Sequence, residues 1–305
     1  MAITVYNLRK WYKMLTGKNI LHVNQGMGQC FSPGRVNGYF NDLTEKVLKE
    51  PELLHTKKLP VVKAESGENI TFPVAIFQYG LGAYDLFLQT GRNEYLDKFN
   101  QCVKWAMENQ LENGAWNNFF FMFPKQPYGA MCQGESVSLL LRAFENTGDT
   151  IYFNAAKRAI DFMLTAVENG GTAKYMGDDL VLLECTHKPA VLNGWIFALF
   201  GLYDFTLVSD DKEYYTLLER TLKTLKKTLP RFDCGYWSMY DDGGMIASPF
   251  YHSLHIAQME ALYKITGNAL FEQYRQRWLK DRSSKLKKAR AFLKKAYQKT
   301  VEKSA

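Results

Sequence analysis

Apolar positions along the chain group into paired segments of helical length. The first segment of each pair is almost wholly apolar. The second, as at 95–109 and 152–168, mixes charged and apolar residues with the period of an amphipathic helix. This pattern predicts a buried inner helix followed by an outer helix with one solvated face. The apolar members of the pairs lie at 74–88, 137–144, 196–205 and 256–265.

A short motif recurs at the break within each pair. It is Thr-Gly with an aromatic residue four positions after the glycine, and a degenerate Ser-Asp copy fills the one gap. Glycine suits a helix C-terminus, and the spacings of 57, 62 and 57 residues match two helices and two turns. We predict an all-α fold of four helical hairpins that closes into an α/α barrel, or toroid, with an open solenoid as the alternative. The copies are Thr90-Gly91, Thr147-Gly148, Ser209-Asp210 and Thr266-Gly267.

The repeat divides the chain into three regions. Residues 1–70 show no period and are expected to form an irregular segment that packs on the barrel and wraps its mouth. Residues 71–280 form the predicted barrel, and residues 281–305 form a basic C-terminal helix. Neither a dinucleotide-binding glycine motif nor a P-loop occurs.

Composition narrows the class of protein. The 305 residues are 47% hydrophobic and 23% charged, as in a soluble globular protein, and no apolar stretch reaches the roughly 20 residues of a membrane span. The N-terminus lacks the apolar core of a signal peptide, so a cytoplasmic location is expected. Five scattered cysteines without a Cys-x-x-Cys spacing predict reduced thiols rather than a disulfide framework or a zinc site.

The charge is concentrated near the C-terminus. A net charge of +7 favours an anionic partner, such as nucleic acid, an acidic polysaccharide or a membrane surface, but residues 280–303 carry most of the excess. This tail is either a packing helix with a solvated basic face or a contact for a polyanion or membrane surface. Its apolar positions are Leu286, Ala289, Phe292, Leu293 and Tyr297.

Polar residues enter the otherwise apolar inner helices at similar places in the repeat. We expect them to gather at one end of the barrel, where a concave mouth could bind a small molecule or sugar unit, although each alone could be a helix cap or an internal hydrogen bond. Two histidines three residues apart could share a metal, but no third ligand stands at a motif distance, so no metal is expected. The residues are Gln78, Tyr79, Gln133, Glu135, Asn193, His252 and His255.

Several segments of the chain together resemble one family. Over about residues 70–280 they occur in the order found in the D-glucuronyl C5-epimerase C-terminal region. The resemblance implies an α/α barrel and a cofactor-independent isomerase that inverts C5 of glucuronate in an anionic polysaccharide such as heparosan, with no nucleic acid partner and with a homodimer expected. The segments are FPVAIFQYGLGAYD (72–85), WAMENQLENGAW (105–116), MCQGESVSLLLRAF (131–144), VLNGWIFALFGLYD (191–204), LPRFDCGYWSMYD (229–241) and YHSLHIAQMEALYKITG (251–267).

The resemblance also implies roles for single residues. Glu184 and Tyr251 correspond to the groups that remove and return the C5 proton, and Tyr240 corresponds to a supporting tyrosine. A tyrosine of ordinary pKa is a poor base at neutral pH, so cationic neighbours are expected beside it. His252 and His255 are the nearest candidates.

The chain departs from the family pattern at two places. Cys185 stands where family members have a tyrosine, and the arginine that follows Tyr240-Asp241 in animal relatives is missing. Either Lys188 or Arg231 therefore binds the substrate carboxylate, or the substrate differs from that of the family. Two other functions stay open at this point: a polysaccharide lyase, which also removes the C5 proton, and a non-catalytic glycan-binding barrel.

Overall fold

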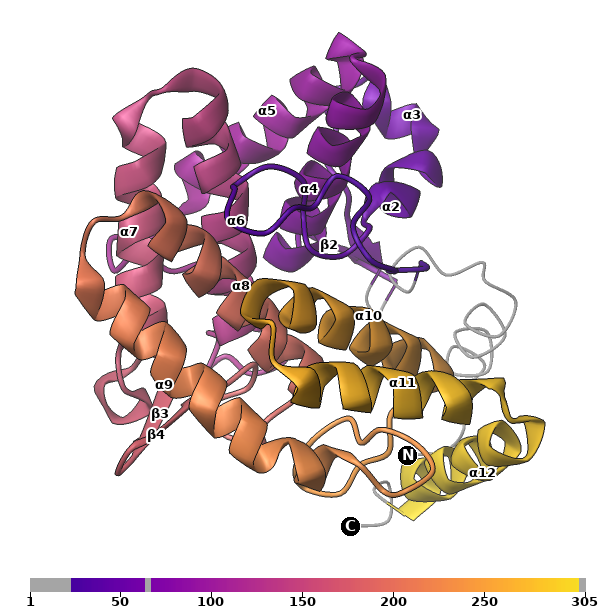
Figure 1. The fold of residues 1–305 in the computed structure, drawn as a ribbon. Coiled ribbons are helices and arrows are strands. Elements are labelled where there is room, and N and C mark those ends of the chain that lie inside the picture. Colours follow the sequence, from indigo (N-terminus) through magenta and orange to yellow (C-terminus); the bar gives the residue numbers. More distant parts are fainter. Residues whose placement is uncertain (1–22, 64–66, 302–305) are drawn as a thin grey trace.

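The computed structural model describes residues 23–63 and 67–301 and contains the predicted helical hairpins in order along the chain (Figure 1). Before the first hairpin lie α2 (Thr44–Leu48), α3 (Pro51–Leu54) and the antiparallel pair β1 (Val62–Lys63) with β2 (Asn69–Ile70). The connections between later hairpins contain the 3-10 turns Val167–Asn169 and Leu229–Phe232 and the antiparallel pair β3 (Ala173–Met176) with β4 (Asp179–Leu182). The prediction of an α/α barrel of four hairpins is confirmed. The hairpins are α4 (Pro73–Thr90) with α5 (Asn93–Asn109), α6 (Ala130–Thr147) with α7 (Thr150–Leu164), α8 (Leu192–Val208) with α9 (Lys212–Thr228), and α10 (Pro249–Thr266) with α11 (Ala269–Ser283).

The recurring Thr-Gly motif closes the inner helices. Gly91, Gly148 and Gly267 each cap a helix at a φ of 65° to 72°, a conformation that favours glycine. The threonine hydroxyl adds a second closure: Thr90 Oγ1 donates to the carbonyl of Leu86 at 2.6 Å, and the same bond recurs in the other two copies. The degenerate copy keeps the break but not the left-handed residue, since α8 ends at Ser209 with φ −99°.

The inner helices pack side by side in the order α4, α6, α8 and α10. Glycines allow α6 and α8 to approach backbone to backbone, because a β-carbon on Gly134 would lie 2.6 Å from Ala198 Cα and one on Gly201 would lie 2.5 Å from Gly134 Cα. A buried ion pair, Arg142 Nη1 to Asp204 Oδ2 at 2.7 Å, also joins the two helices.

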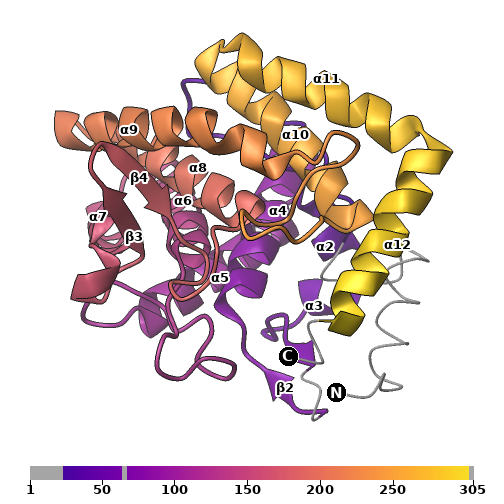
Figure 2. The same ribbon diagram turned by 90° about the horizontal axis from the view of Figure 1, so that it is seen from below.

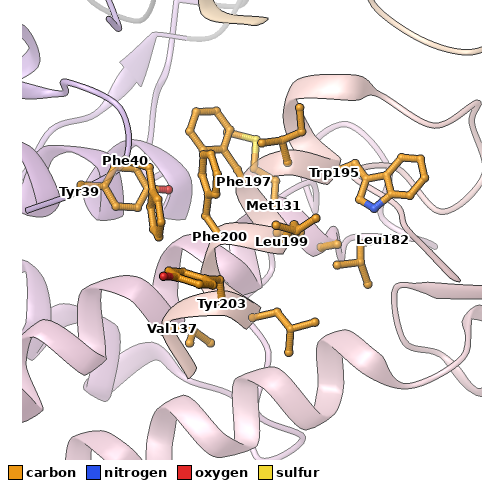
Figure 3. Close-up of a cluster of buried hydrophobic side chains, with 14 of the residues drawn as sticks. Tyr39, Phe40, Met131, Val137, Leu182, Trp195, Phe197, Leu199, Phe200 and Tyr203 are labelled. Carbon is orange, nitrogen blue, oxygen red and sulfur yellow. The ribbon is translucent and has the colours of Figure 1, made fainter. Parts of the chain in front are cut away.

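The N-terminal segment fills one end of the barrel. Phe40 stacks on Phe200 of α8 with ring centroids 4.1 Å apart, and Tyr39 lies parallel to Phe197 (Figure 3). The backbone N–H of Tyr39 donates to Asp85 of α4 at 2.9 Å. The described part of this segment therefore enters the barrel instead of only wrapping its mouth. Residues 1–22 of the predicted segment lie outside the described residues.

The C-terminal helix α12 (Lys285–Val301) turns away from the end of α11 and runs along the side of the molecule (Figure 2). Its predicted packing face is exposed: Leu286 is 84% and Leu293 67% accessible, whereas Ala291 on another face is buried. Of the two alternatives for this tail, the helix does pack on the protein, but not through the apolar stripe. An amphipathic period identifies two faces but not which of them meets the protein, and here Ala291 and Gln298 make the contact.

The helices within residues 23–63 and 67–301 are too short or too polar for any of them to cross a membrane.

Candidate active site

Glu184 lies where a short hairpin meets the entrances of two inner helices. Strand β4 ends just before it, and the intervening Leu183 accepts a hydrogen bond from the N–H of Ala130, at the start of α6, at 2.8 Å. The N–H of Leu183 also donates to the carbonyl of Thr172 at 2.9 Å. The backbone before Glu184 is thus fixed to the start of α6.

Two glycines make room for Glu184. A β-carbon on Gly129 would lie 2.2 Å from the carbonyl oxygen of Glu184, and one on Gly194, in the first turn of α8, would lie 2.2 Å from its Oε2. Any larger residue at either position would displace the glutamate. The carboxyl group therefore packs against the positive end of the α8 helix dipole, which favours negative charge.

The environment of Glu184 sets its proton affinity. Oε2 is buried and accepts no hydrogen bond from the described residues. Burial raises the pKa of Glu184 to about 7, while the positive charge of Lys188 opposes the rise. At neutral pH the group is consequently divided between its acid and its base form, the condition that suits a general acid–base catalyst.

Two tyrosines complete the group around Glu184. Tyr240 and Tyr251, with ring centroids 4.8 Å apart, come from the loop after α9 and from the first turn of α10. The carbonyl of Tyr240 accepts from the N–H of Leu192, which ties this loop to the start of α8. Burial raises the pKa of both phenols, and the negative charge of Glu184 raises both further. Both are neutral proton donors at physiological pH.

Positive charge lies on two sides of this group. On one side, the charge of Lys188 lowers the pKa of Glu184, and Lys188 Nζ lies 4.5 Å from the ring centroid of Phe123. On the other side, Nζ of Lys295 in α12 lies 5.4 Å from the ring centroid of Tyr240. Arg231 is largely exposed and is paired with Asp242 at 3.2 Å. A surface hollow beside Lys188 includes Lys174, Leu183, Thr186, His187 and Asp242 among its lining residues.

Cys185 lies next to Glu184 and is partly buried. Burial is the main cause of a rise in its pKa to about 12, and Glu184 adds to it, so the thiol is neutral. It therefore places an uncharged group beside Tyr240.

The polar residues at the entrances of the inner helices divide into two groups. Gln133 in the first turn of α6 and Asn193 in the first turn of α8 have side-chain carbonyl oxygens that are buried without a hydrogen-bond partner among the described residues. Gln78 and Glu135 lie one repeat apart and bond directly, with Gln78 Nε2 donating to Glu135 Oε1 at 2.7 Å. Tyr79 lies outside both groups, since its hydroxyl donates to the carbonyl of Glu50 at 3.3 Å.

A buried lysine that sequence reasoning missed faces Glu135. Lys46 of α2 is only 4% accessible, and Glu135 is its largest electrostatic partner. Burial lowers the pKa of Lys46 and raises that of Glu135, in both cases to about 8. The Glu184 carboxylate also raises the pKa of Glu135, which connects this buried pair to the site. A single lysine in an aperiodic segment carries no sequence signal for such a role.

His252 and His255 pack against Ser238 and Trp278 instead of lying beside Tyr251 and Glu184 as substrate-binding groups. The N–H of Ser238 donates to Nδ1 of His252, and Nε2 of the same ring donates to the carbonyl of Trp278. Both nitrogens of the neutral ring therefore have a hydrogen-bond partner. Trp237 stacks on the same ring at 3.7 Å. Burial lowers the pKa of His252 to about 3 and that of His255 well below its ordinary value. They do not supply the positive charge expected beside Tyr251.

A second surface hollow lies between α7 and the connection from α5 to α6. Arg158 and Asp161 are the charged residues on its α7 side, and both are engaged within the protein, by Gln110 and by Lys157 with Tyr214 respectively. Neither hollow, nor any other part of 23–63 and 67–301, gathers three or more metal-ligating side chains. The Glu184 site is therefore the better candidate for chemistry.

The fold and this site define an α/α-barrel protein with a partly buried carboxyl group and two phenols at the helix N-terminal end of the barrel. Comparison with known families then identifies the chain: it belongs to the family described as D-glucuronyl C5-epimerase C-terminus, which matches residues 98–280. The resemblance predicted from the sequence is confirmed.

Two relatives extend this comparison. An uncharacterized protein of Methanocaldococcus jannaschii is 35% identical over 156 residues, covering 49% of this chain and 51% of the relative. A D-glucuronyl C5-epimerase of Caenorhabditis elegans is 24% identical over 217 residues, covering 62% of this chain and 35% of the relative. The chain thus spans about half of one relative and about a third of the other.

Among solved structures, an unsaturated glucuronyl hydrolase specific for heparin matches with a TM-score of 0.54 and 12% identity over 79% of this chain and 66% of the hydrolase. At this identity the match concerns the fold alone.

Proposed function

We propose that this chain inverts C5 of D-glucuronate units within an anionic polysaccharide and thereby forms L-iduronate. The observation that carries the proposal is the meeting of Glu184, with a pKa of about 7, and the neutral phenols of Tyr251 and Tyr240 in one partly exposed site. Membership of the epimerase family supports the same reaction.

The reaction needs a base on one face of the sugar and an acid on the other. The C5–H bond is weakly acidic because C5 lies next to the carboxylate. Ionised Glu184 takes this proton, and the electron pair of the broken bond spreads onto the substrate carboxylate. Tyr251 then gives its phenolic proton to C5 from the opposite face.

After this step Glu184 carries a proton and Tyr251 is a phenolate. The hydrogen bond with Tyr240 lowers the pKa of Tyr251 and so stabilises that phenolate. This state is the one required for the reverse reaction, in which Tyr251 removes the proton from L-iduronate and Glu184 returns one. Proton exchange with water resets the site after a forward turnover.

The remaining site residues differ in their access to the sugar. Lys188 stabilises the negative charge that develops on the substrate carboxylate, because it already acts electrostatically on Glu184. Gln133 and Asn193 are buried and their side-chain carbonyl oxygens have no hydrogen-bond partner among the described residues, so neither oxygen reaches the surface where a sugar would bind. Arg231 lies on the rim, where its bond to Asp242 would compete with substrate.

Product analysis tests the proposal. Incubation with heparosan, followed by degradation and disaccharide analysis, should yield L-iduronate from the natural chain and none above background from Glu184→Gln. Glu168→Gln makes the same chemical change on an exposed 3-10 turn and should leave the yield unaltered. Ultraviolet absorbance from an unsaturated uronate would indicate a lyase and overturn the proposal.

A further inference from the structure

The loop between the two site tyrosines carries negative charge only. From Tyr240 to Tyr251 the sequence contains Asp241 and Asp242 but no lysine or arginine. Asp241 accepts hydrogen bonds from the N–H groups of Gly243 and Met245, both at 3.0 Å, so its carboxylate is held beside Tyr240. A site for an anionic sugar therefore needs positive charge from another element on this side.

Helix α12 brings that charge to the tyrosine. Lys295 Nζ lies 5.4 Å from the ring centroid of Tyr240, within the range of a cation–π contact. The same ammonium group acts on Asp241 and opposes the rise of its pKa. Lys295 thus lies on the Tyr240 side of the site, and Lys188 acts from the Glu184 side.

The loop itself fixes the position of α12. Gln298 Nε2 donates to the carbonyl of Gly244 at 2.8 Å, and its Oε1 accepts from the N–H of Ile246 at 2.9 Å. Gln298 follows Lys295 by three residues and therefore shares a helix face with it. Arg290 adds a second anchor, with its guanidinium 4.0 Å from the ring centroid of Tyr236. Lys295 is consequently held at the site by the same loop that carries Tyr240.

We propose that Lys295 binds a glucuronate carboxylate of the polysaccharide substrate on the Tyr240 side of the site. This inference rests on the proposed function and makes α12, which lies beyond the matched residues 98–280, a wall of the substrate site. When substrate binds, its carboxylate joins that of Asp241 as a negative charge beside Lys295. The helix then supplies specificity for an acidic over a neutral sugar.

Matched substitutions on α12 test this role. Lys295→Met should weaken calorimetric binding of a heparosan oligosaccharide by about tenfold, the effect of one partly exposed charge-assisted hydrogen bond, and Lys295→Arg should restore most of it. Lys288→Met removes the same charge from an exposed position of the same helix and should change affinity less than about twofold. Binding of the carboxyl-reduced oligosaccharide should be equal in all four proteins, and their melting temperatures should agree.

The outcomes separate the inference from the function on which it rests. If the natural protein binds heparosan and forms iduronate, but Lys295→Met keeps the full preference for the acidic oligosaccharide, the Lys295 inference is wrong and the function stands. Equal losses in Lys295→Met and Lys288→Met would show a long-range charge effect and also overturn it. If the natural protein discriminates neither oligosaccharide and forms no iduronate, both fail together.

Discussion

The rings of Tyr240 and Tyr251 lie 4.8 Å apart and are inclined by 58°, although one belongs to a loop and the other to the first turn of α10. Each is partly buried next to Glu184, and this burial keeps each phenol protonated. The site therefore combines two protonated phenols with a carboxyl group whose pKa is about 7, as the proposed acid and base roles require.

The ionisation of Glu184 should govern the pH dependence of proton removal. Because the base is the ionised form, kcat/KM for C5 exchange should rise about tenfold per pH unit below pH 7 and level off above it. Lys188→Met removes a charge that lowers this pKa, so the rising limb should move to higher pH. A limb near the ordinary glutamate value of about 4.3 would contradict this assignment.

Loss of the tyrosine should separate exchange from inversion. In Tyr251→Phe, Glu184 can still remove the C5 proton and return a deuteron from heavy water to the same face. Deuterium should thus enter glucuronate, whereas iduronate formation should fall by about 10²–10⁴-fold. Mass spectrometry and NMR of the product disaccharides measure the two rates. Tyr215→Phe, at an exposed position of α9, is the control, and normal inversion in Tyr251→Phe would remove Tyr251 from the mechanism.

The contact between Gly194 and Glu184 should be intolerant of a methyl group. Gly194→Ala places a β-carbon 2.2 Å from Glu184 Oε2, so the carboxyl group must move, and a displacement of about 1 Å can cost about 10²-fold in rate. We expect kcat to fall by about that factor with the fold retained by circular dichroism. Gly26→Ala, where the added carbon meets no described atom within 4 Å, should be silent. Full activity in Gly194→Ala would show that Glu184 is not held as described.

The buried histidines should destabilise the protein in mild acid. The pKa of His252 is about 3 in the folded state and about 6.5 when unfolded, so below pH 6.5 only the unfolded chain takes up the proton. The titration of His252 therefore leaves the free energy of unfolding unaffected above pH 6.5, and lowers it by about 1.4 kcal/mol per pH unit as pH falls from 6.5 towards 3. Denaturant unfolding of His252→Asn should show a correspondingly shallower slope between pH 6.5 and 5.

The acidic groups do not obscure this comparison. Glu135 and Glu184 have raised pKa values in the fold and favour folding as pH falls, but they are unchanged in the histidine variant. NMR of the His252 ring provides a check that does not require the variant to fold. A ring that titrates between pH 5 and 7.5 would contradict the neutral, buried assignment.

The sequence repeat predicts much of the architecture because each copy ends an inner helix and begins an outer one. Gly91 and its equivalents end helices wherever the chain must adopt a left-handed turn, and the 57-residue spacing places Gln78 beside Glu135 in the next hairpin. Contacts that follow the repeat are thus accessible from the sequence alone.

Contacts that break the repeat are not accessible in this way. Tyr39, Lys46 and Lys295 come from segments outside the repeat, and their places depend on how those segments fold back onto the barrel. The orientation of the His252 side chain could not be predicted from the sequence for another reason. It lies one residue after Tyr251, and a turn of about 100° per residue carries its ring to Trp237 and Trp278.

Incubation of the natural protein with heparosan in heavy water tests the central claim most directly. The account predicts deuterium at C5 of newly formed L-iduronate units in polymer of unchanged length. When the Glu184→Gln variant replaces the natural protein, no deuterium should enter. Shortened chains with unsaturated ends, or tight binding of the polymer without any deuterium at C5, would contradict it.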